Sequence, residues 1–330
     1  MSIKNRLVAT WYGGYNAALL QPPIRPGYKM EPLIETVTQQ LQLAAGETRR
    51  LFHGRGHCYP GLEHLVIDWF APVAVVRLYE EVEPAWCERL CAALAQVAGI
   101  EALVVQSRGR GRETRNEIAW GQVPERLKAT ELGLQYWVSP LQNQNSGLFL
   151  DMREGRRWVR EQASGARVLN LFAYSCAFSV AAMAGGAASV VNLDMSRGAL
   201  ARGRENHQLN QHDQRDVRYL GHDLLKSWGK LRKLGPYDLI LIDPPSFQPG
   251  SFVAEHDYRK VVRRLPELTQ TGSRILACHN DPLHDTGFIR ALMAQECPQF
   301  GFRERLNNPD DFPEQDPERA LKVLLFEREA

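Results

Sequence analysis

The chain has 330 residues, of which 44% are hydrophobic, and its 40 lysines and arginines nearly balance 38 aspartates and glutamates, for a formal net charge of +2. This composition excludes a disordered chain, a collagen-like repeat and a small disulfide scaffold, and the length predicts about two domains, each with its own core. The near-neutral balance gives no sign of a generally basic nucleic-acid-binding surface, so any site for a polyanion must be local.

No apolar run approaches the ~20 residues that cross a bilayer, and the opening sequence lacks the apolar segment of a signal peptide. We therefore expect a cytoplasmic protein with no membrane partner. The six cysteines are dispersed, which indicates reduced thiols. Cys87 and Cys91 lie one helical turn apart on an apolar face, which is typical of core packing. His53, His57 and Cys58 lack a fourth ligand at a recognisable spacing, so no metal site is predicted.

The first half of the chain contains short segments that are rich in strand-forming residues. Residues 1–48 indicate an irregular arm followed by one helix over 31–44. Residues 49–138 predict a small α+β domain. Its expected elements are strands over 62–70, 73–81 and 101–105 and an amphipathic helix over 84–98.

A glycine-rich stretch, 107–125, carries Arg108, Arg110, Arg112 and Arg115. We expect it to form an exposed loop that connects the two halves of the chain. The alternative, an arm that contacts phosphates, is slightly less favoured because a charge run is usually a solvated surface.

From residue 139 to residue 330 apolar strands alternate with helices, which predicts an α/β domain with a mostly parallel sheet covered on both faces. The expected strands are 168–173, 188–194, 216–220, 238–243, 274–278, 300–306 and 320–327. The expected helices are 177–186, 196–210, 224–235, about 254–270 and 284–296. Seven strands that end in an antiparallel hairpin describe a Rossmann-like, doubly wound sheet, whereas an ordinary dinucleotide-binding domain lacks the closing strand pair.

Ligands of such sheets bind beyond the carboxyl ends of the strands, so the loops that follow the strands are the candidate sites. The first strand leads into a turn of mostly small residues, 170–179, which lets a ligand approach the backbone at a helix N-terminus. Asp194 ends the second strand 22 residues after Phe172, close to the spacing at which a carboxylate accepts from ribose hydroxyls. The alternative role of Asp194 is a helix cap. Asp223 either accepts from an adenine amino group or caps a helix, and the sequence favours neither.

The fourth strand ends in Asp243-Pro244-Pro245-Ser246-Phe247. Two prolines fix their φ angles and keep Asp243 extended, which makes a stiff platform. Such a platform can hold a carboxylate and a carbonyl against a flat substrate, and Phe247 is available to stack on a base. A proline pair can also merely end a strand, but the acid and the aromatic side chain beside it favour catalysis.

Five segments together resemble a known family: 50–70, 145–154, 170–187, 192–210 and 239–247 are similar to the bacterial 23S ribosomal RNA large-subunit methyltransferases of types I and K/L. The resemblance covers about residues 50–330 and implies a class I methyltransferase sheet with S-adenosylmethionine as methyl donor and S-adenosylhomocysteine as product. It implies cofactor contacts by Phe149, Asp151, Arg153, Asn170, Phe172, Tyr174, Cys176, Ala177, Phe178, Asp194, Met195, Asn210, Asp223 and Asp243. It implies catalytic roles for Asp243, Pro244, Pro245, Phe247 and Asn280.

Two departures from the family pattern bear on the substrate. The first fifty residues do not resemble the small RNA-binding domain with which many type I members begin. Cytosine-C5 methylating members carry a cysteine nucleophile after the fifth strand, whereas this chain has Asn280 in that place in an ungapped alignment, with Cys278 two positions earlier. Guanine N7 already exposes a lone pair and needs no thiolate, so the loop favours N7 of guanine over C5 of cytosine.

The expected partner is RNA, either ribosomal RNA or a ribosomal assembly particle. Two alternatives stay open at this point. One is a methyltransferase that acts on a protein or a small molecule, and the other is a cofactor-binding module that has lost catalysis. A homodimer is one option for the oligomeric state.

Overall fold

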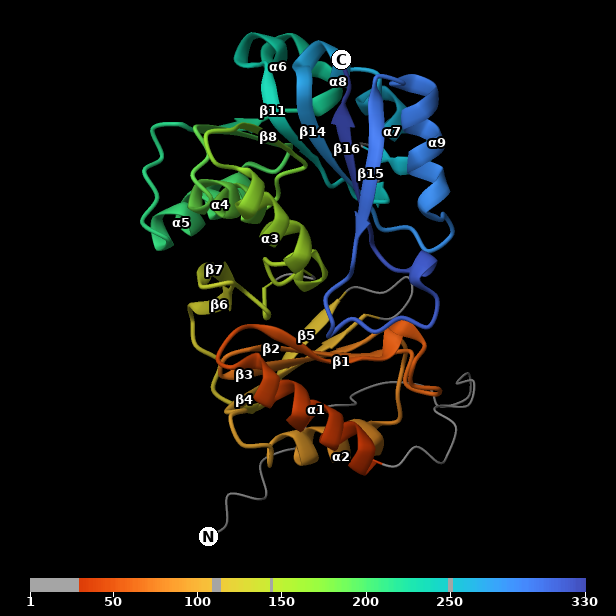
Figure 1. Cartoon of the computed structure of the whole chain (residues 1–330). Coiled ribbons are helices and arrows are strands. Elements are labelled where there is room, and N and C mark those ends of the chain that lie inside the picture. The colour runs from red at the N-terminus through yellow and green to blue at the C-terminus, as the bar shows by residue number, and fades with distance from the viewer. Residues whose placement is uncertain (1–29, 109–113, 143–144, 249–251) are drawn as a thin grey trace. The chain divides into compact units, whose positions relative to one another are not determined.

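The structure is a computed structural model that describes residues 30–108, 114–142, 145–248 and 252–330 (Figure 1). The chain divides into two compact units. The first comprises the described residues up to Gly133 together with Val138–Leu150 and Asp310–Gln315, and the second comprises Leu134–Trp137, Asp151–Pro309 and Asp316–Ala330. The predicted segments 1–48, 49–138 and 139–330 are continuous, whereas both units are assembled from separate stretches of chain.

The first unit is built on a five-stranded sheet with the order β1-β2-β3-β4-β5. Only β3 and β4 pair in parallel, and α2 connects them. Helix α1 contributes Leu33 and Val37 to the same core as this sheet, so it is part of the unit rather than of a separate arm. The elements are α1 (Met30–Ala44), β1 (Arg49–His53), η3 (Gly54–Gly56), β2 (Leu65–Phe70), β3 (Val73–Leu78), α2 (Pro84–Leu94), β4 (Ala102–Ser107), β5 (Arg115–Gly121) and β6 (Leu127–Glu131).

The prediction of a loop over 107–125 is wrong in its second part. Residues 115–121 form β5, which pairs antiparallel with β4 at the edge of the sheet. Every residue of β5 is exposed or half-buried, so the strand lacks the apolar alternation by which strands are recognised. Arg110 and Arg112 lie outside the described residues.

The second unit contains a seven-stranded sheet with the order β10-β9-β8-β11-β14-β16-β15 (Figure 1). Strands β10 to β14 are parallel neighbours, and β16 runs antiparallel to both β14 and β15, which confirms the predicted sheet with its terminal hairpin. The sequence order of the strands reverses between β8 and β11.

The strands of this sheet are β8 (Arg167–Leu171), β9 (Ser189–Asp194), β10 (Val217–Gly221), β11 (Tyr237–Ile242), β14 (Thr269–His279), β15 (Phe300–Leu306) and β16 (Lys322–Arg328). Two short pairs are β6 with β7 (Leu134–Val138) and β12 (Phe247–Gln248) with β13 (Phe252–Val253). The helices are η4 (Leu150–Met152), α3 (Arg153–Gln162), α4 (Ala177–Ala184), α5 (Arg197–Leu209), η5 (Leu224–Lys226), α6 (Trp228–Leu234), α7 (Ala254–Val262), α8 (Leu265–Leu268), α9 (Thr286–Glu296) and η6 (Pro317–Arg319). Among the described residues, no helix combines the length and the apolar character that a membrane span needs.

Alternate residues of the central strands enter two separate cores, as the period of two in a strand requires. Leu169, Ile240, Ile275 and their counterparts pack against α6, α7, α8 and α9. Val168, Leu239 and Leu276 pack against α3 and α4 on the other face. Both faces are therefore covered, which explains why the strands are apolar throughout.

The predicted helix over 254–270 is also wrong in part. It divides into α7 and α8, and β14 already begins at Thr269. Pro266 lies in the first turn of α8, where its missing N–H costs no hydrogen bond, and this favours a new helix start. The predicted helix over 224–235 likewise divides into η5 and α6.

Helix α5 packs closely on the loop that follows β8. A Cβ atom added to Gly203 would lie 2.3 Å from Sγ of Cys176 and 2.8 Å from its Cβ, and Cys176 is fully buried. On the same helix, a Cβ added to Gly198 would meet no atom closer than 3.9 Å.

We therefore expect Gly203→Ala to lower the free energy of unfolding by about 1–3 kcal/mol through overpacking. Gly198→Ala is the matched control and should stabilise α5 by about 0.5–1 kcal/mol, because alanine favours a helix over glycine. Adding Cys176→Gly to Gly203→Ala should recover part of the loss, because glycine removes the clash and tolerates the backbone conformation of that position. Urea unfolding of the four proteins measures these effects, and an unchanged stability of Gly203→Ala would contradict the close packing.

Candidate active site

Five parallel strands end at one edge of the second unit's sheet. Leu171 at the end of β8 pairs with Leu193 on β9 and with Ile242 on β11, and Ile242 pairs with Ala277 on β14. The residues that follow these pairs are therefore neighbours at the carboxyl edge. The reversal of strand order lies at the same place, between β8 and β11, which is where open α/β sheets bind ligands.

The loop after β8 has an unusual backbone. Phe172, Tyr174 and Cys176 adopt positive φ angles of 58°, 45° and 59°, a conformation that residues other than glycine rarely adopt. Three backbone N–H groups hold the loop in place: Ala173 donates to the carbonyl of Leu193 (3.0 Å), Tyr174 to Oδ2 of Asp194 (2.8 Å) and Cys176 to the carbonyl of Ala173 (2.7 Å). Such left-handed residues are typical of binding sites, where the surrounding bonds enforce them.

The Asp194 carboxylate joins the loop to β9. Its Oδ2 accepts from Tyr174, and its Oδ1 accepts from the backbone N–H of Ser196 at 2.7 Å. The cap of α5 is Ser196, whose hydroxyl accepts from the backbone N–H of Ala199, so the alternative role of Asp194 as the helix cap is wrong. Asp194 is half-buried, and Met195 beside it is 53% exposed.

The side chains of Asn170, Cys176 and Phe178 point into the protein. Cys176 packs against Leu200 in a small cluster, and Phe178 lies in the core between α3 and α4. Asn170 is also buried, and its amide donates to Oδ1 of Asn192 at 2.9 Å. The cofactor contacts predicted for these residues, and for Ala177 at the start of α4, therefore stay predictions. They concern backbone atoms rather than side chains.

The structure argues against the predicted cofactor role of Asn210. This residue follows α5, at the opposite end of the helix from Asp194. Its amide donates to the carbonyls of Gln135 and Asn206 and accepts from the backbone N–H of Gln135 at 2.9 Å. Asn210 thus holds strand β7.

Asp223 caps the helix η5, which is one of its two predicted roles. Its Oδ1 accepts from the backbone N–H of Leu225 at 2.9 Å, and Oδ2 lies 3.3 Å from Nζ of Lys226. A carboxylate has further lone pairs, so the cap does not exclude an adenine contact.

Asp243 lies in the most electrostatically unusual part of the edge. Burial, and after it the nearby Asp151 carboxylate, raise the pKa of its carboxyl to about 7, against the opposing effect of the Arg156 guanidinium. Arg156 is 2% exposed. A carboxyl group with this pKa exchanges its proton near neutral pH, which is typical of functional sites.

The platform after Asp243 is linked to the loop after β14. Pro244 is buried and Pro245 half-buried. The Ser246 hydroxyl donates to the backbone carbonyl of Asn280 at 2.7 Å, and Asn280 itself is exposed. The structure thus brings together the two segments for which catalytic roles were predicted. Phe247 belongs to β12, but its side chain is outside what the structure describes.

Cys278 is fully buried on β14, with Sγ 4.0 Å from Sδ of Met152. Burial raises the pKa of the thiol well above its ordinary value, and the carboxylates of Asp243 and Asp151 raise it further. The thiol is therefore protonated at neutral pH and is a poor nucleophile.

Sequence analysis missed two residues near Asp243. Tyr258 on α7 is fully buried and donates its hydroxyl to the carbonyl of Cys278 at 3.2 Å. Arg156 lies on the buried face of α3 between Met152 and Val159. The sequence predicts this position of Arg156, because residues three or four positions apart lie on the same face of a helix.

The remaining predicted residues lie near the start of α3. Arg153 is buried, with its Nε 3.6 Å from the Glu154 carboxylate. Phe149 belongs to the first unit and is 44% exposed.

In the first unit, both ring nitrogens of His53 face other side chains, Arg50 at 2.8 Å and Glu314 at 3.3 Å. Within the described ranges, His53, His57 and Cys58 do not form a group with metal-ligand geometry.

Residues 49–327 match a family model described as S-adenosylmethionine-dependent methyltransferase. Among the curated relatives, the ribosomal RNA large subunit methyltransferase K/L of Vibrio parahaemolyticus is 37% identical over 233 residues, which cover 66% of this chain and 32% of the relative. The ribosomal RNA large subunit methyltransferase I of Aeromonas salmonicida is 31% identical over 267 residues, which cover 77% and 67%. The chain thus spans about a third of the length of the first of these relatives.

Solved structures show the same fold. The crystal structure of SMU.776 complexed with SAH superimposes with a TM-score of 0.82 and 24% identity, over 92% of this chain and 83% of that one.

The raised pKa of Asp243 predicts a specific pH dependence of stability. Between the ordinary pKa of 3.8 and about 7, the folded protein binds a proton that the unfolded chain has released, so the free energy of unfolding falls as the pH rises through this window. Asp243→Asn stays neutral and should remove this slope, which makes it more stable than the parent at pH 8 by up to about 4 kcal/mol, and by less where solvent reaches the carboxyl.

Denaturant unfolding between pH 4 and pH 8 measures the slope. Asp151→Asn, which removes the neighbouring negative charge, should lower the pKa of Asp243 in the folded protein, so that the fall in stability ends at a lower pH. Equal slopes for the parent and Asp243→Asn would show that Asp243 ionises normally.

Proposed function

The chain belongs to the family of S-adenosylmethionine-dependent methyltransferases, and from this premise we propose that it methylates a base of large-subunit ribosomal RNA, at guanine N7. Its relatives, the ribosomal RNA large subunit methyltransferases K/L and I, support the RNA substrate. The proposed setting is the cytoplasm, with the RNA free or within a ribosomal assembly particle. The homodimer stays a prediction.

The residues at the carboxyl edge fit the cofactor, which supplies the methyl group. The half-buried Asp194 carboxylate retains lone pairs beyond its two backbone bonds, and it stands at the strand end where ribose hydroxyls bind in such sheets. The left-handed loop at 172–176 is bonded to the end of β9, and its Cys176 side chain points into the protein, so that backbone of the loop lies next to the strand end. We propose that Asp194 accepts from the ribose, that Asp223 accepts from the adenine amino group, and that the loop lines the remainder of the site.

On the substrate side we propose Asp243, Pro244, Pro245 and Asn280. The proline pair fixes the Asp243 backbone, and the hydrogen bond from Ser246 fixes the backbone of Asn280. An amide offers both a donor and an acceptor to a base edge, and a carboxyl with a pKa near 7 can offer either. These groups suit the positioning of a base whose nitrogen lone pair accepts the methyl group directly.

The observation that carries the choice of atom is the burial of Cys278. Methylation of cytosine at C5 begins with addition of a thiolate to C6. A fully buried thiol with a raised pKa is a poor candidate for that step, and Asn280 cannot replace it because an amide is not a nucleophile of this kind. Transfer to N7 needs no adduct with the enzyme.

For the cofactor, we expect Asp194→Ala to lower the affinity for S-adenosylmethionine about 10–150-fold, because charge-assisted hydrogen bonds contribute about 1.5–3 kcal/mol. Calorimetry of the purified protein measures this. Asp213→Ala, which removes an exposed carboxylate paired with Arg215, is the matched control and should bind like the parent. Asp194→Asn should be intermediate, because its amide oxygen can still accept one backbone bond. An unchanged affinity of Asp194→Ala with an intact fold would remove Asp194 from the site.

For the substrate, ribosomal RNA from cells that lack the protein should gain a methyl group on a guanine when treated with the purified enzyme, and mapping of modified nucleotides identifies the position. Cys278→Ala should retain activity, and RNA that contains 5-fluorocytosine should not trap the enzyme. An inactive Cys278→Ala of unchanged thermal stability, together with a trapped parent enzyme, would assign cytosine C5 instead. No transfer to RNA at all would refute the proposed substrate.

A further inference from the structure

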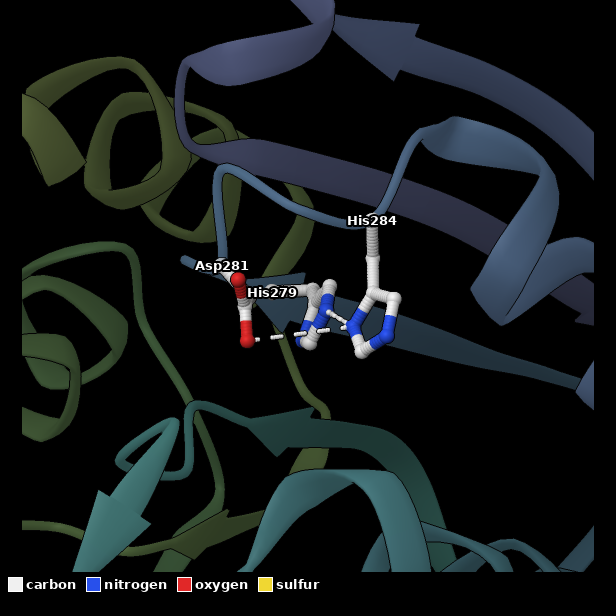
Figure 2. A group of neighbouring side chains, drawn as sticks. All are labelled: His279, Asp281 and His284. Atoms are coloured by element: carbon white, nitrogen blue, oxygen red, sulfur yellow. Dashed lines mark hydrogen bonds and ion pairs between the residues drawn. The ribbon is translucent and has the colours of Figure 1, made fainter.

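Next to the candidate active site, three potential metal ligands come from six consecutive residues. His279 ends β14, and Asp281 and His284 lie in the segment that leads to α9 (Figure 2). One ligand atom of each lies within 4.8 Å of the other two. Neither the predicted methyltransferase site nor the relatives' names account for this group.

We propose that His279, Asp281 and His284 bind one divalent transition-metal ion of the zinc class. Nε2 of His279 lies 3.1 Å from Nδ1 of His284, and Oδ2 of Asp281 lies 3.8 Å from the same Nδ1. Ligands at about 2.0–2.2 Å from a tetrahedral zinc ion stand roughly 3.3 Å apart, so both separations close around one ion with small side-chain movements. Two imidazoles and one carboxylate are a donor set that zinc, cobalt and nickel accept.

The rings are held in place before any ion binds. The ring of Phe288 stacks on His284 at 4.2 Å with an interplanar angle of 7°, and His279 is 1% exposed and stacks on the same ring at 5.0 Å. Oδ1 of Asp281 accepts from the backbone N–H of Leu283 at 2.9 Å, which orients Oδ2 toward the histidines. Such surrounding contacts raise affinity by lowering the ordering cost of binding.

The local charges leave the site open to a cation. The Lys322 ammonium is a positive charge close to the site, and its Nζ donates to the backbone carbonyls of Asp281 and Glu318, both at 2.8 Å. The carboxylates of Glu318, Asp281 and Asp285 offset it, since each raises the pKa of Lys322, although burial and Arg305 lower that pKa on balance.

Binding needs both facing nitrogens free of hydrogen. The hydrogen that now joins Nε2 of His279 to Nδ1 of His284 would move, through solvent, to the other nitrogen of the same ring. Two neutral imidazoles thus become ligands with no net loss of protons. The ion would complete its shell with water and tie the end of β14 to the start of α9, with Asn280 between two of the ligands.

The test uses the full chain, with the affinity tag removed and in a Cys58→Ser background, because Cys58 is an exposed thiol and cysteine sulfur is a zinc ligand. After treatment with a chelator, calorimetry with Zn²⁺ should give one site per chain, and Co²⁺ should give a visible absorption band of a low-coordinate site. His284→Ala should weaken Zn²⁺ binding at least about 100-fold and Asp281→Asn at least about 10-fold, since even indirect contacts of metal ligands are worth 10–100-fold.

His256→Ala, at an exposed histidine of α7, is the matched control and should bind Zn²⁺ like the parent. Zn²⁺ should raise the Tm of the parent and of this control but not that of His284→Ala. Absence of saturable binding, or equal affinity in the parent and His284→Ala, would refute the site and leave a purely structural histidine pair. S-adenosylmethionine binding, measured in parallel, reports the fold of each variant. The metal result therefore stands apart from the outcome of the RNA assay.

Discussion

Two hydrogen bonds to the Asp194 carboxylate hold the candidate active site together. The loop that it restrains contains three left-handed residues other than glycine, each of which costs of order 1–3 kcal/mol. The bond from Tyr174 is charge-assisted, and it forms only because the parallel pairing of β8 and β9 brings their ends side by side. The sheet therefore supplies the position, and the Asp194 carboxylate supplies one of the three backbone hydrogen bonds that restrain the loop.

The same loop shows how a candidate binding surface forms without glycines of its own. The loop contains no glycine, and the side chains of Cys176 and Phe178 point into the protein. Cys176 fits against Gly203, and Phe178 fits against Gly155 on α3, where a Cβ would stand 3.4 Å from its ring. The glycines are thus on the neighbouring helices rather than in the loop. In a glycine-rich loop the glycines of the loop leave the space for close packing. Here the glycines of α3 and α5 leave it.

The sequence predicted the second unit's sheet well because apolar strands buried on both faces leave a strong pattern. It failed where burial is partial: β5 is an edge strand with polar residues, and nothing in its pattern separates it from a loop. Asn210 shows a different limit. A motif assigns a role to a residue from its position in the sequence. The hydrogen bonds of Asn210 with Gln135 depend instead on where β7 lies in the fold. Arg156 escaped notice because buried arginines are rare, although the period of α3 placed it inward.

Asp243 and Cys278 acquire opposite chemical characters from one cause. Cys278 is fully buried and Asp243 is half-buried, and in both desolvation favours the neutral form. For the thiol, with an ordinary pKa of 9.0, this shift moves ionisation out of reach and removes the nucleophile. For the carboxyl, with an ordinary pKa of 3.8, the shift moves ionisation to about 7, where the proton can be held or released. The same desolvation therefore makes the Cys278 thiol a poor nucleophile and leaves the Asp243 carboxyl able to hold or release a proton near neutral pH. Under the proposed function, the preference for a nitrogen acceptor then follows from burial at the strand ends, and the buried Arg156 cation keeps the carboxyl from losing its charge altogether.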